Sequence, residues 1–277
     1  MTGRGSPDPE IRVRIDANYG TLTPQEARAA DFILDHLDDL AVYSATEIAS
    51  SSGVSKATVS RLFRRLGFAD AQEVREHARE LRLRGVPVGA PGSLAAHAAA
   101  EHEALERMLA GLGDGLLEAA AGVVSAAAEV VVAGFRNSYP VALHLREQLA
   151  QARGAVRIAP APGQSVGEEL AGLGPSDAVV LIGFRRRPAG FDAVLASLGT
   201  RGVPVVLVVE PGWRGAAPAG TVVLTCPVDA VGAFDSYASA MSLANLLATR
   251  VLARQGSAGR ARVAAITALY GELGELE

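Results

Sequence analysis

The first part of the chain spaces its apolar residues as helices do. Thr23-Pro24-Gln25-Glu26 is a helix start, with Thr as the N-cap and Glu three positions later. Apolar residues then fall on one face over 27–40, and further helices are predicted over 47–51, 56–66 and 70–84. We expect a flexible arm over 1–20. The pattern therefore predicts a small all-α domain over 21–85.

From Glu129 onwards the pattern changes to short, continuously apolar runs rich in Val and Ile. Such runs indicate strands buried on both faces, as in a parallel sheet, and helical segments separate them. We expect a doubly wound, mostly parallel five-stranded α/β domain over 128–255. The strands are predicted over 130–133, 156–159, 178–182, 203–209 and 221–225, and the helices over 139–151, 168–173 and 191–200.

The remaining segments connect or extend these two domains. A linker, Gly85 to Ser93, and an Ala-rich helix over 94–125 make up the predicted linker and bridging helix, 86–127. That helix can pack on either domain or on a second subunit. A long helical region over 235–254 leads to a C-terminal helix within 256–277.

Composition agrees with two folded domains. The chain has 277 residues, of which 49% are apolar, and its single cysteine excludes a disulfide framework. The sequence shows no apolar run of membrane-spanning length, and its first residues lack the apolar core of a signal peptide. We therefore expect a cytoplasmic protein without a membrane partner.

Charge is unevenly distributed although the net charge is only −4. Residues 16–47 hold seven acidic and one basic residue, whereas residues 53–84 hold eight basic and four acidic residues. Phosphate backbones respond to local positive potential, so the second window is a candidate nucleic-acid surface.

The segment from Thr46 to Gly67 has the pattern of a helix-turn-helix. Ala49 permits a close helix crossing, and Gly53 permits a left-handed turn. The second helix of such a unit enters the major groove. We predict base or near-base contacts from its N-terminal polar residues and phosphate contacts from its arginines. The candidates are Ser55, Lys56, Thr58 and Ser60 for bases and Arg61, Arg64 and Arg65 for phosphates. The alternative is an amphipathic helix with a solvated basic face.

The stretch from Leu22 to Arg79 resembles the N-terminal domain of the RpiR/MurR family of bacterial transcriptional regulators. GVSKATVSRLFRRLGF, residues 53–68, is the most specific part. The resemblance implies a C-terminal sugar isomerase (SIS) domain that senses phosphosugars. It also implies a homodimer or homotetramer that binds a palindromic operator on double-stranded DNA.

The first predicted strand runs into Gly134-Phe-Arg-Asn-Ser138, where an α/β sheet binds ligands. Helix N-termini attract anions, and Arg136, Asn137 and Ser138 offer donors there. The segment resembles the Gly-x-Gly-x-Ser turn of SIS domains, with Arg136 in place of the second Gly. The alternative is that Ser138 only caps the following helix.

The third predicted strand ends in Arg185, Arg186 and Arg187, where SIS domains are rich in Ser and Thr. Three adjacent cations suggest an anion, which we expect to be a ligand that Arg136 also contacts, and alternatives are a partner subunit or a solvated basic turn. Gln164, Ser165 and Glu168 follow the second strand and can line the same crevice. Glu168 can equally be a first-turn acid of a helix.

These observations predict a transcriptional regulator whose SIS-like domain senses an anionic small molecule such as a phosphosugar or a sugar acid. A regulator without a small-molecule effector, with its arginine turn at a subunit interface, is the second hypothesis. A sugar-phosphate isomerase is the third. None of the five His follows a strand, and no metal or cofactor motif is present in the sequence, so we expect no enzyme, no metal and no cofactor.

Overall fold

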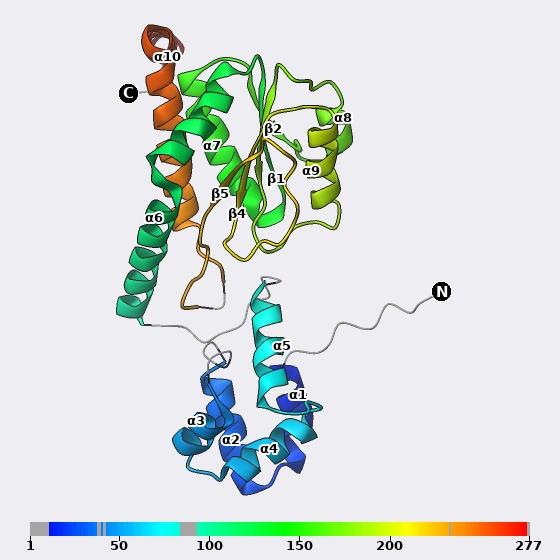
Figure 1. The fold of residues 1–277 in the computed structure, drawn as a ribbon. Helices are drawn as coiled ribbons and strands as arrows, with labels where there is room; N and C mark the ends of the chain where they lie inside the picture. Colours follow the sequence, from blue (N-terminus) through cyan, green and yellow to red (C-terminus); the bar gives the residue numbers. More distant parts are fainter. Residues whose placement is uncertain (1–10, 38–39, 41–42, 84–92, 233, 276–277) are drawn as a thin grey trace. The chain divides into compact units, whose positions relative to one another are not determined.

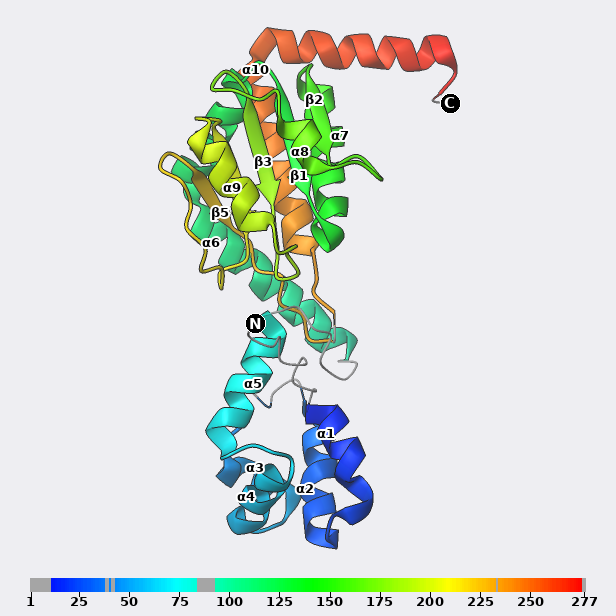
Figure 2. The ribbon, with the colours of Figure 1, turned by 90° about the vertical axis from the view of Figure 1, so that its right-hand side faces the viewer.

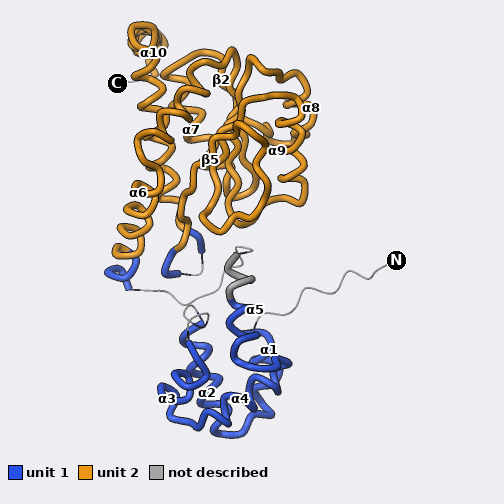
Figure 3. Tube along the Cα trace, viewed as in Figure 1, with its two compact units in different colours: residues 1–97, 230–235 blue, residues 98–229, 236–277 orange. Residues whose placement is uncertain are grey.

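A computed structural model of the chain describes residues 11–37, 40, 43–83, 93–232 and 234–275 (Figure 1). The chain divides into two compact units (Figure 3). One comprises residues 1–97 with 230–235, and the other comprises residues 98–229 with 236–277. The expected linker over 86–92 lies outside the described residues.

The N-terminal unit is all helical up to residue 83, as predicted. Its elements are α1 (Ile11–Asn18), η1 (Tyr19–Thr21), α2 (Pro24–Asp35), α3 (Ala45–Ser52), α4 (Lys56–Arg65) and α5 (Ala71–Leu83). The capping box of α2 is confirmed, because the Thr23 hydroxyl accepts from the Glu26 N–H and Glu26 accepts from the Thr23 N–H. A second capping box joins Ser44 to Glu47, so α3 begins two residues earlier than predicted.

The expected flexible arm over 1–20 is wrong for residues 11–20. Ile11 and Ile15, four positions apart, lie on one face of α1 and are buried in the core of this unit. The Tyr19 hydroxyl donates to the Asp31 carboxylate at 2.6 Å. This helix escaped prediction because two apolar residues among charged ones carry little signal until a partner surface is known.

The second unit contains a five-stranded, all-parallel sheet, which confirms the predicted fold class. The strands are β1 (Val130–Gly134), β2 (Val156–Ala159), β3 (Ala178–Ile182), β4 (Val205–Val209) and β5 (Val222–Thr225), in the order β2-β1-β3-β4-β5. Val130 pairs with both Val156 and Ala178, so the carboxyl ends of the three strands lie at one edge. The chain order reverses between β1 and β3, which defines a topological switch point there.

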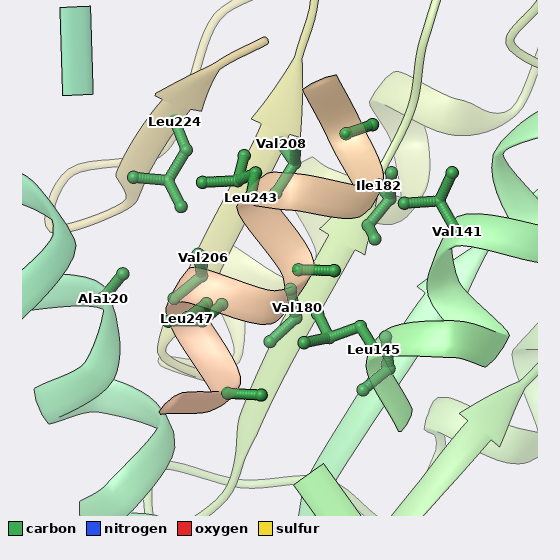
Figure 4. Close-up of a cluster of buried hydrophobic side chains, with 14 of the residues drawn as sticks. Ala120, Val141, Leu145, Val180, Ile182, Val206, Val208, Leu224, Leu243 and Leu247 are labelled. Carbon is green, nitrogen blue, oxygen red and sulfur yellow. The ribbon is translucent and has the colours of Figure 1, made fainter. Parts of the chain in front are cut away.

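Helices cover both faces of the sheet because alternate side chains of each strand point to opposite sides. The helices are η2 (Arg136–Ser138), α6 (Leu94–Ala126), α7 (Tyr139–Ala152), α8 (Val166–Leu170), α9 (Phe191–Thr200) and α10 (Ala238–Leu273). On one face, Val180 and Val206 pack with Leu145 of α7 and Leu247 of α10 (Figure 4). On the other face, Val179 and Leu207 pack with α8 and α9.

The two longest helices each contain a non-helical glycine. Gly113 interrupts α6 at φ 57° and Gly256 interrupts α10 at φ 55°. Figure 2 shows the part of α10 after Gly256 turned away from the part before it. Among the described residues, α6 alone is long and apolar enough to cross a membrane. Its residues Met108, Leu117 and Val124 nevertheless belong to the core cluster of the sheet domain.

Candidate functional sites

The turn between α3 and α4 has the geometry that the helix-turn-helix pattern predicts. Gly53 adopts the left-handed conformation, with φ 67° and ψ 33°. A Cβ at this position would lie 2.8 Å from the Arg28 guanidinium, so glycine is required by both conformation and space. Ile48, Val59 and Leu62 fill the core between the helices, as expected.

The outward face of α4 carries the cations. Lys56, Arg61 and Arg64 are exposed, and Ser60 is half-buried. Ser55 is the N-cap residue, and its hydroxyl accepts from the Thr58 N–H at 3.1 Å. Ala57 is exposed between these polar residues, and sequence reasoning missed it because an alanine carries no chemical signal.

Two of the predicted DNA-contacting residues are engaged inside the domain. Thr58 is 4% exposed, and its hydroxyl hydrogen-bonds to the Ser55 hydroxyl and accepts from Arg61. Because the Thr58 side chain is buried and hydrogen-bonded within the domain, this geometry does not present it to a base. Arg65 donates to the Thr21 carbonyl at 2.6 Å and lies 3.7 Å from the Glu26 carboxylate.

Glu26 joins the start of α2 to the end of α4. Its carboxylate is buried, yet its pKa is held below the usual 4.5, chiefly by the hydrogen bond from the Thr23 N–H. The Thr23 hydroxyl and the charges of Arg65 and Arg61 lower the pKa further, whereas burial raises it. Glu26 is therefore an ionised anchor for the basic helix.

In the second unit, the turn after β1 holds the first candidate ligand residues. Arg136 is exposed and adopts φ 53°, a conformation that favours glycine. Arg136 stands where the Gly-x-Gly-x-Ser pattern has its second Gly, and its backbone has a conformation typical of glycine. Asn137 is exposed. A Cβ at position 134 would lie only 2.7 Å from the Ala142 Cβ, so Gly134 leaves room for the close approach of α7.

Ser138 joins the turn after β1 to the turn after β3. Its hydroxyl accepts from the Phe184 N–H at 3.1 Å, and its side chain is buried. It makes no capping hydrogen bond to α7, so the capping alternative is wrong. The two predicted anion turns therefore lie side by side at the switch point between β1 and β3.

Arg187 forms an ion pair with a buried carboxylate. It donates to both oxygens of Glu210 at 2.8 Å and to the Gly183 carbonyl at 3.0 Å. Glu210 follows β4 and is 4% exposed. The Arg187 guanidinium also lies 5.7 Å from the centre of the Phe191 ring. The donors of Arg187 thus hold two strand ends together, and contact of Arg187 with a ligand stays a prediction.

Arg185 has a counter-charge as well, although a more accessible one. It forms an ion pair with Asp229, which follows β5 and has a side chain 49% exposed. Asp229 lies 3.6 Å from Arg107 of α6. Arg186 is half-buried in the same turn. The Arg185 side chain is itself 13% exposed, so Arg136, which is exposed, is the more accessible cation for an incoming anion.

The turn after β2 contributes less than predicted. Gln164, Ser165 and Glu168 are exposed, and β2 lies beside β1 at the outer end of the sheet. In the part of the chain that the structure describes, no hydrogen bond joins these three residues to the other two turns. Glu168 lies in the first turn of α8, where an acid favours the helix dipole.

Sequence reasoning missed Glu210 and Asp229. Both follow a predicted strand at the same edge of the sheet as the arginine turn. Arg136 and Arg185 were selected because they follow a strand. Glu210 and Asp229 follow β4 and β5, so the same rule selects them once acids are considered as counter-charges. Only the sheet order shows which acid meets which arginine.

The folds and sites described so far define a two-domain protein with a helix-turn-helix unit and a doubly wound α/β unit. Residues 10–78 match the family model "Helix-turn-helix domain, rpiR family". The N-terminal unit therefore contains a helix-turn-helix domain of the rpiR type. No curated protein matches the sequence.

Solved structures agree with this fold. The sugar isomerase domain of the RpiR transcription factor from Sphaerobacter thermophilus is 23% identical, with a TM-score of 0.57. The match covers 62% of this chain and 96% of that one. The Vibrio vulnificus NanR protein, complexed with ManNAc-6P, is 18% identical, with a TM-score of 0.56, over 95% of this chain and 98% of that one. The second likeness extends over both domains.

Proposed function

We propose that this protein is a DNA-binding transcriptional regulator whose SIS-like domain senses an anionic small molecule. The observation that carries the proposal is the exposed basic face of α4 directly after a left-handed Gly53. In this geometry the start of α4 enters the major groove, where Ser55, Lys56 and Ser60 reach base edges. Arg61 and Arg64 then contact phosphates, and Thr58 holds Ser55 in place.

A selection from a pool of random DNA duplexes with the full-length protein tests this part. The expected result is a palindromic sequence, because one recognition helix reads half a site and a symmetric dimer reads two. Lys56→Ala should weaken binding to the selected duplex, whereas Arg260→Ala, an exposed arginine of α10, should not. Equal binding to the selected duplex and to a scrambled one would contradict the proposal.

The effector site that we propose lies at the carboxyl ends of β1 and β3, between the turns that follow these two strands. Arg136 and Arg185 supply positive charge, and Asn137 supplies an amide. NanR is complexed with ManNAc-6P, so a phosphosugar is a reasonable first probe, with sugar acids as the second class. We expect the effector to be bound and released unchanged, because Glu210, the buried acid of this edge, is held by Arg187.

A thermal-shift screen of the full-length protein against phosphosugars, sugar acids and inorganic anions tests the effector site. A ligand at about 100 times its dissociation constant adds about 2.7 kcal/mol of stability. Arg136→Ala and Arg185→Ala should each reduce the shift. A shift that both variants retain would move the site elsewhere, and conversion of a phosphosugar to product would support an isomerase.

A regulator without a small-molecule effector is the second candidate. The observation that favours it is that Arg187 and Arg185 already have Glu210 and Asp229 as counter-charges. In that case no anion in the screen shifts the unfolding temperature, and the arginine turn serves a subunit interface. Crosslinking between Arg185→Cys variants of two copies then distinguishes an interface from a vacant crevice.

We also propose a homodimer or homotetramer that acts in the cytoplasm. Leu269 and Leu273 are exposed by 51% and 60% on the last part of α10, where a second copy can cover them. Light scattering on the purified protein gives its mass in solution and hence its oligomeric state. Leu269→Glu should shift it towards the monomer, and an unchanged mass would place the interface elsewhere.

A further inference from the structure

A cavity of about 440 Å³ lies near the amino ends of β1 and β2, at the opposite ends of the strands from the proposed effector site. It is bounded by the end of α6, the turn that leads from α7 into β2, and the bend of α10. Its lining consists of Ser125, Ala127, Ala128, Ala152, Arg153, Gly154, Ala155, Gln255, Ala258 and Arg262. Cavities of this size, roughly 300–1,000 Å³, typically hold small molecules.

The lining carries two guanidinium groups and no carboxylate. The first of them, Arg153, is explained by the fold. It donates to the carbonyls of Ala127 and Ala128 at 2.7 and 3.0 Å, to that of Gly154, and to that of Val124. Arg153 thus satisfies the carbonyls at the end of α6, which an isolated helix end leaves unpaired. Burial lowers its pKa, as expected for a desolvated cation.

The second cation is not explained in this way. Arg262 donates through Nε to the Ala150 carbonyl at 2.7 Å. Within the described residues, neither of its terminal nitrogens has a hydrogen-bond partner, so up to four N–H groups remain. Ser125 also lines the cavity, but its hydroxyl oxygen is buried and does not face the open space.

We propose that this cavity is a second binding site, specific for a small molecule that carries an oxyanion such as a phosphate or carboxylate. The fork of Arg262 matches two oxygens of such a group, and a planar guanidinium binds them better than a point charge does. The positive charge of Arg153 adds attraction. The site is separate from the effector crevice, since the two lie at opposite ends of the strands.

The cavity also spans the bend of α10, which gives the ligand a structural effect. Gln255 precedes Gly256, whereas Ala258 and Arg262 follow it. Gly256 has φ 55° and ψ −125°, a conformation that other residues adopt only with strain. A ligand held by Arg262 and attracted by Arg153, which is bonded to the end of α6, therefore ties the last part of α10 to that end, and binding fixes the direction of the helix.

Hydrogen exchange of the full-length protein, followed by mass spectrometry, tests the proposal with inorganic phosphate as the probe. Exchange in peptides over 253–266 is compared in phosphate and in sodium chloride of equal ionic strength. At ten times the dissociation constant, the openings that break the site become about tenfold rarer. Arg262→Ala should abolish this protection.

Two matched variants keep the result specific. Arg260→Ala removes an exposed arginine two positions away on the same helix and should retain the protection. Arg136→Ala changes the effector crevice and should retain it as well. The proposal is overturned if phosphate protects nothing in the wild type, if Arg262→Ala keeps full protection, or if Arg136→Ala abolishes it. Protection that follows protein concentration instead of phosphate would assign the cavity to a second copy and also overturn the proposal.

Discussion

Arg187 and Glu210 form a two-pronged ion pair, with both donor–acceptor distances at 2.8 Å, between the ends of β3 and β4. Glu210 is almost fully buried, and Trp213 donates its backbone N–H to the Glu210 carbonyl. Arg187 is therefore a structural arginine of this turn, which joins the ends of two neighbouring strands.

Breaking that pair should be costly. Arg187→Ala leaves the Glu210 carboxylate buried without its partner, and we expect a loss of about 3–5 kcal/mol in the free energy of unfolding. Urea denaturation of the full-length protein followed by circular dichroism measures it. Arg260→Ala, on the surface, should change the free energy by less than about 0.5 kcal/mol. A similarly small loss for Arg187→Ala would show that the pair contributes little.

Arg136→Gly should separate stability from ligand binding. Arg136 has φ 53°, so glycine relieves strain but adds chain entropy, and the free energy of unfolding should change by less than about 1 kcal/mol. Affinity for an anionic effector should fall, because an exposed guanidinium is lost. Titration calorimetry with a ligand from the thermal-shift screen measures this affinity. Unchanged affinity would remove Arg136 from the effector site.

Arg64→Ala should reduce the salt dependence of DNA binding. Each phosphate contact on duplex DNA contributes about −0.9 to the slope of log K against log salt concentration. The variant's slope should therefore be shallower by about one, with base preference unchanged. Fluorescence anisotropy over a series of salt concentrations gives the slope. If Arg64→Ala changes base preference and leaves the slope alone, Arg64 reads bases and our assignment is wrong.

Glu26→Gln should make the N-terminal domain less stable at neutral pH, by about 1 kcal/mol. The pKa of Glu26 in the folded domain lies below 4.5, the value of an unperturbed carboxyl. Its ionised form therefore stabilises the domain above about pH 4.5, and this contribution is lost as the pH falls through the folded pKa.

Hydrogen exchange of α2 and α4, compared between wild type and Glu26→Gln at each pH, measures that difference. The gap between the two proteins should be largest near neutral pH and should close on acidification. A gap that stays constant from pH 7 to strongly acidic conditions would show that ionisation of Glu26 is not the cause.

The order of the elements could be predicted from the sequence because each element carries its own periodic signal. The apolar runs that became β2, β3 and the core of β1 match the predicted strands within one residue, and α9 matches its predicted bounds. Gly53 predicted the turn because glycine tolerates a left-handed backbone, and Ser55 predicted the second helix because serine is a common N-cap. These features depend on neighbours in the sequence, so no tertiary contact was needed to find them.

The tertiary structure alone decided which polar groups meet. Ser138 and Phe184 are 46 positions apart, and Arg187 and Glu210 are 23 positions apart. No local pattern links such residues, because their contact depends on strand order and register. The same holds for α1, whose two isoleucines became core residues only when the other helices offered a surface. The sequence by itself therefore determined the order of the elements, the basic helix and the strand-end turns, whereas packing decided which acids Arg185 and Arg187 meet.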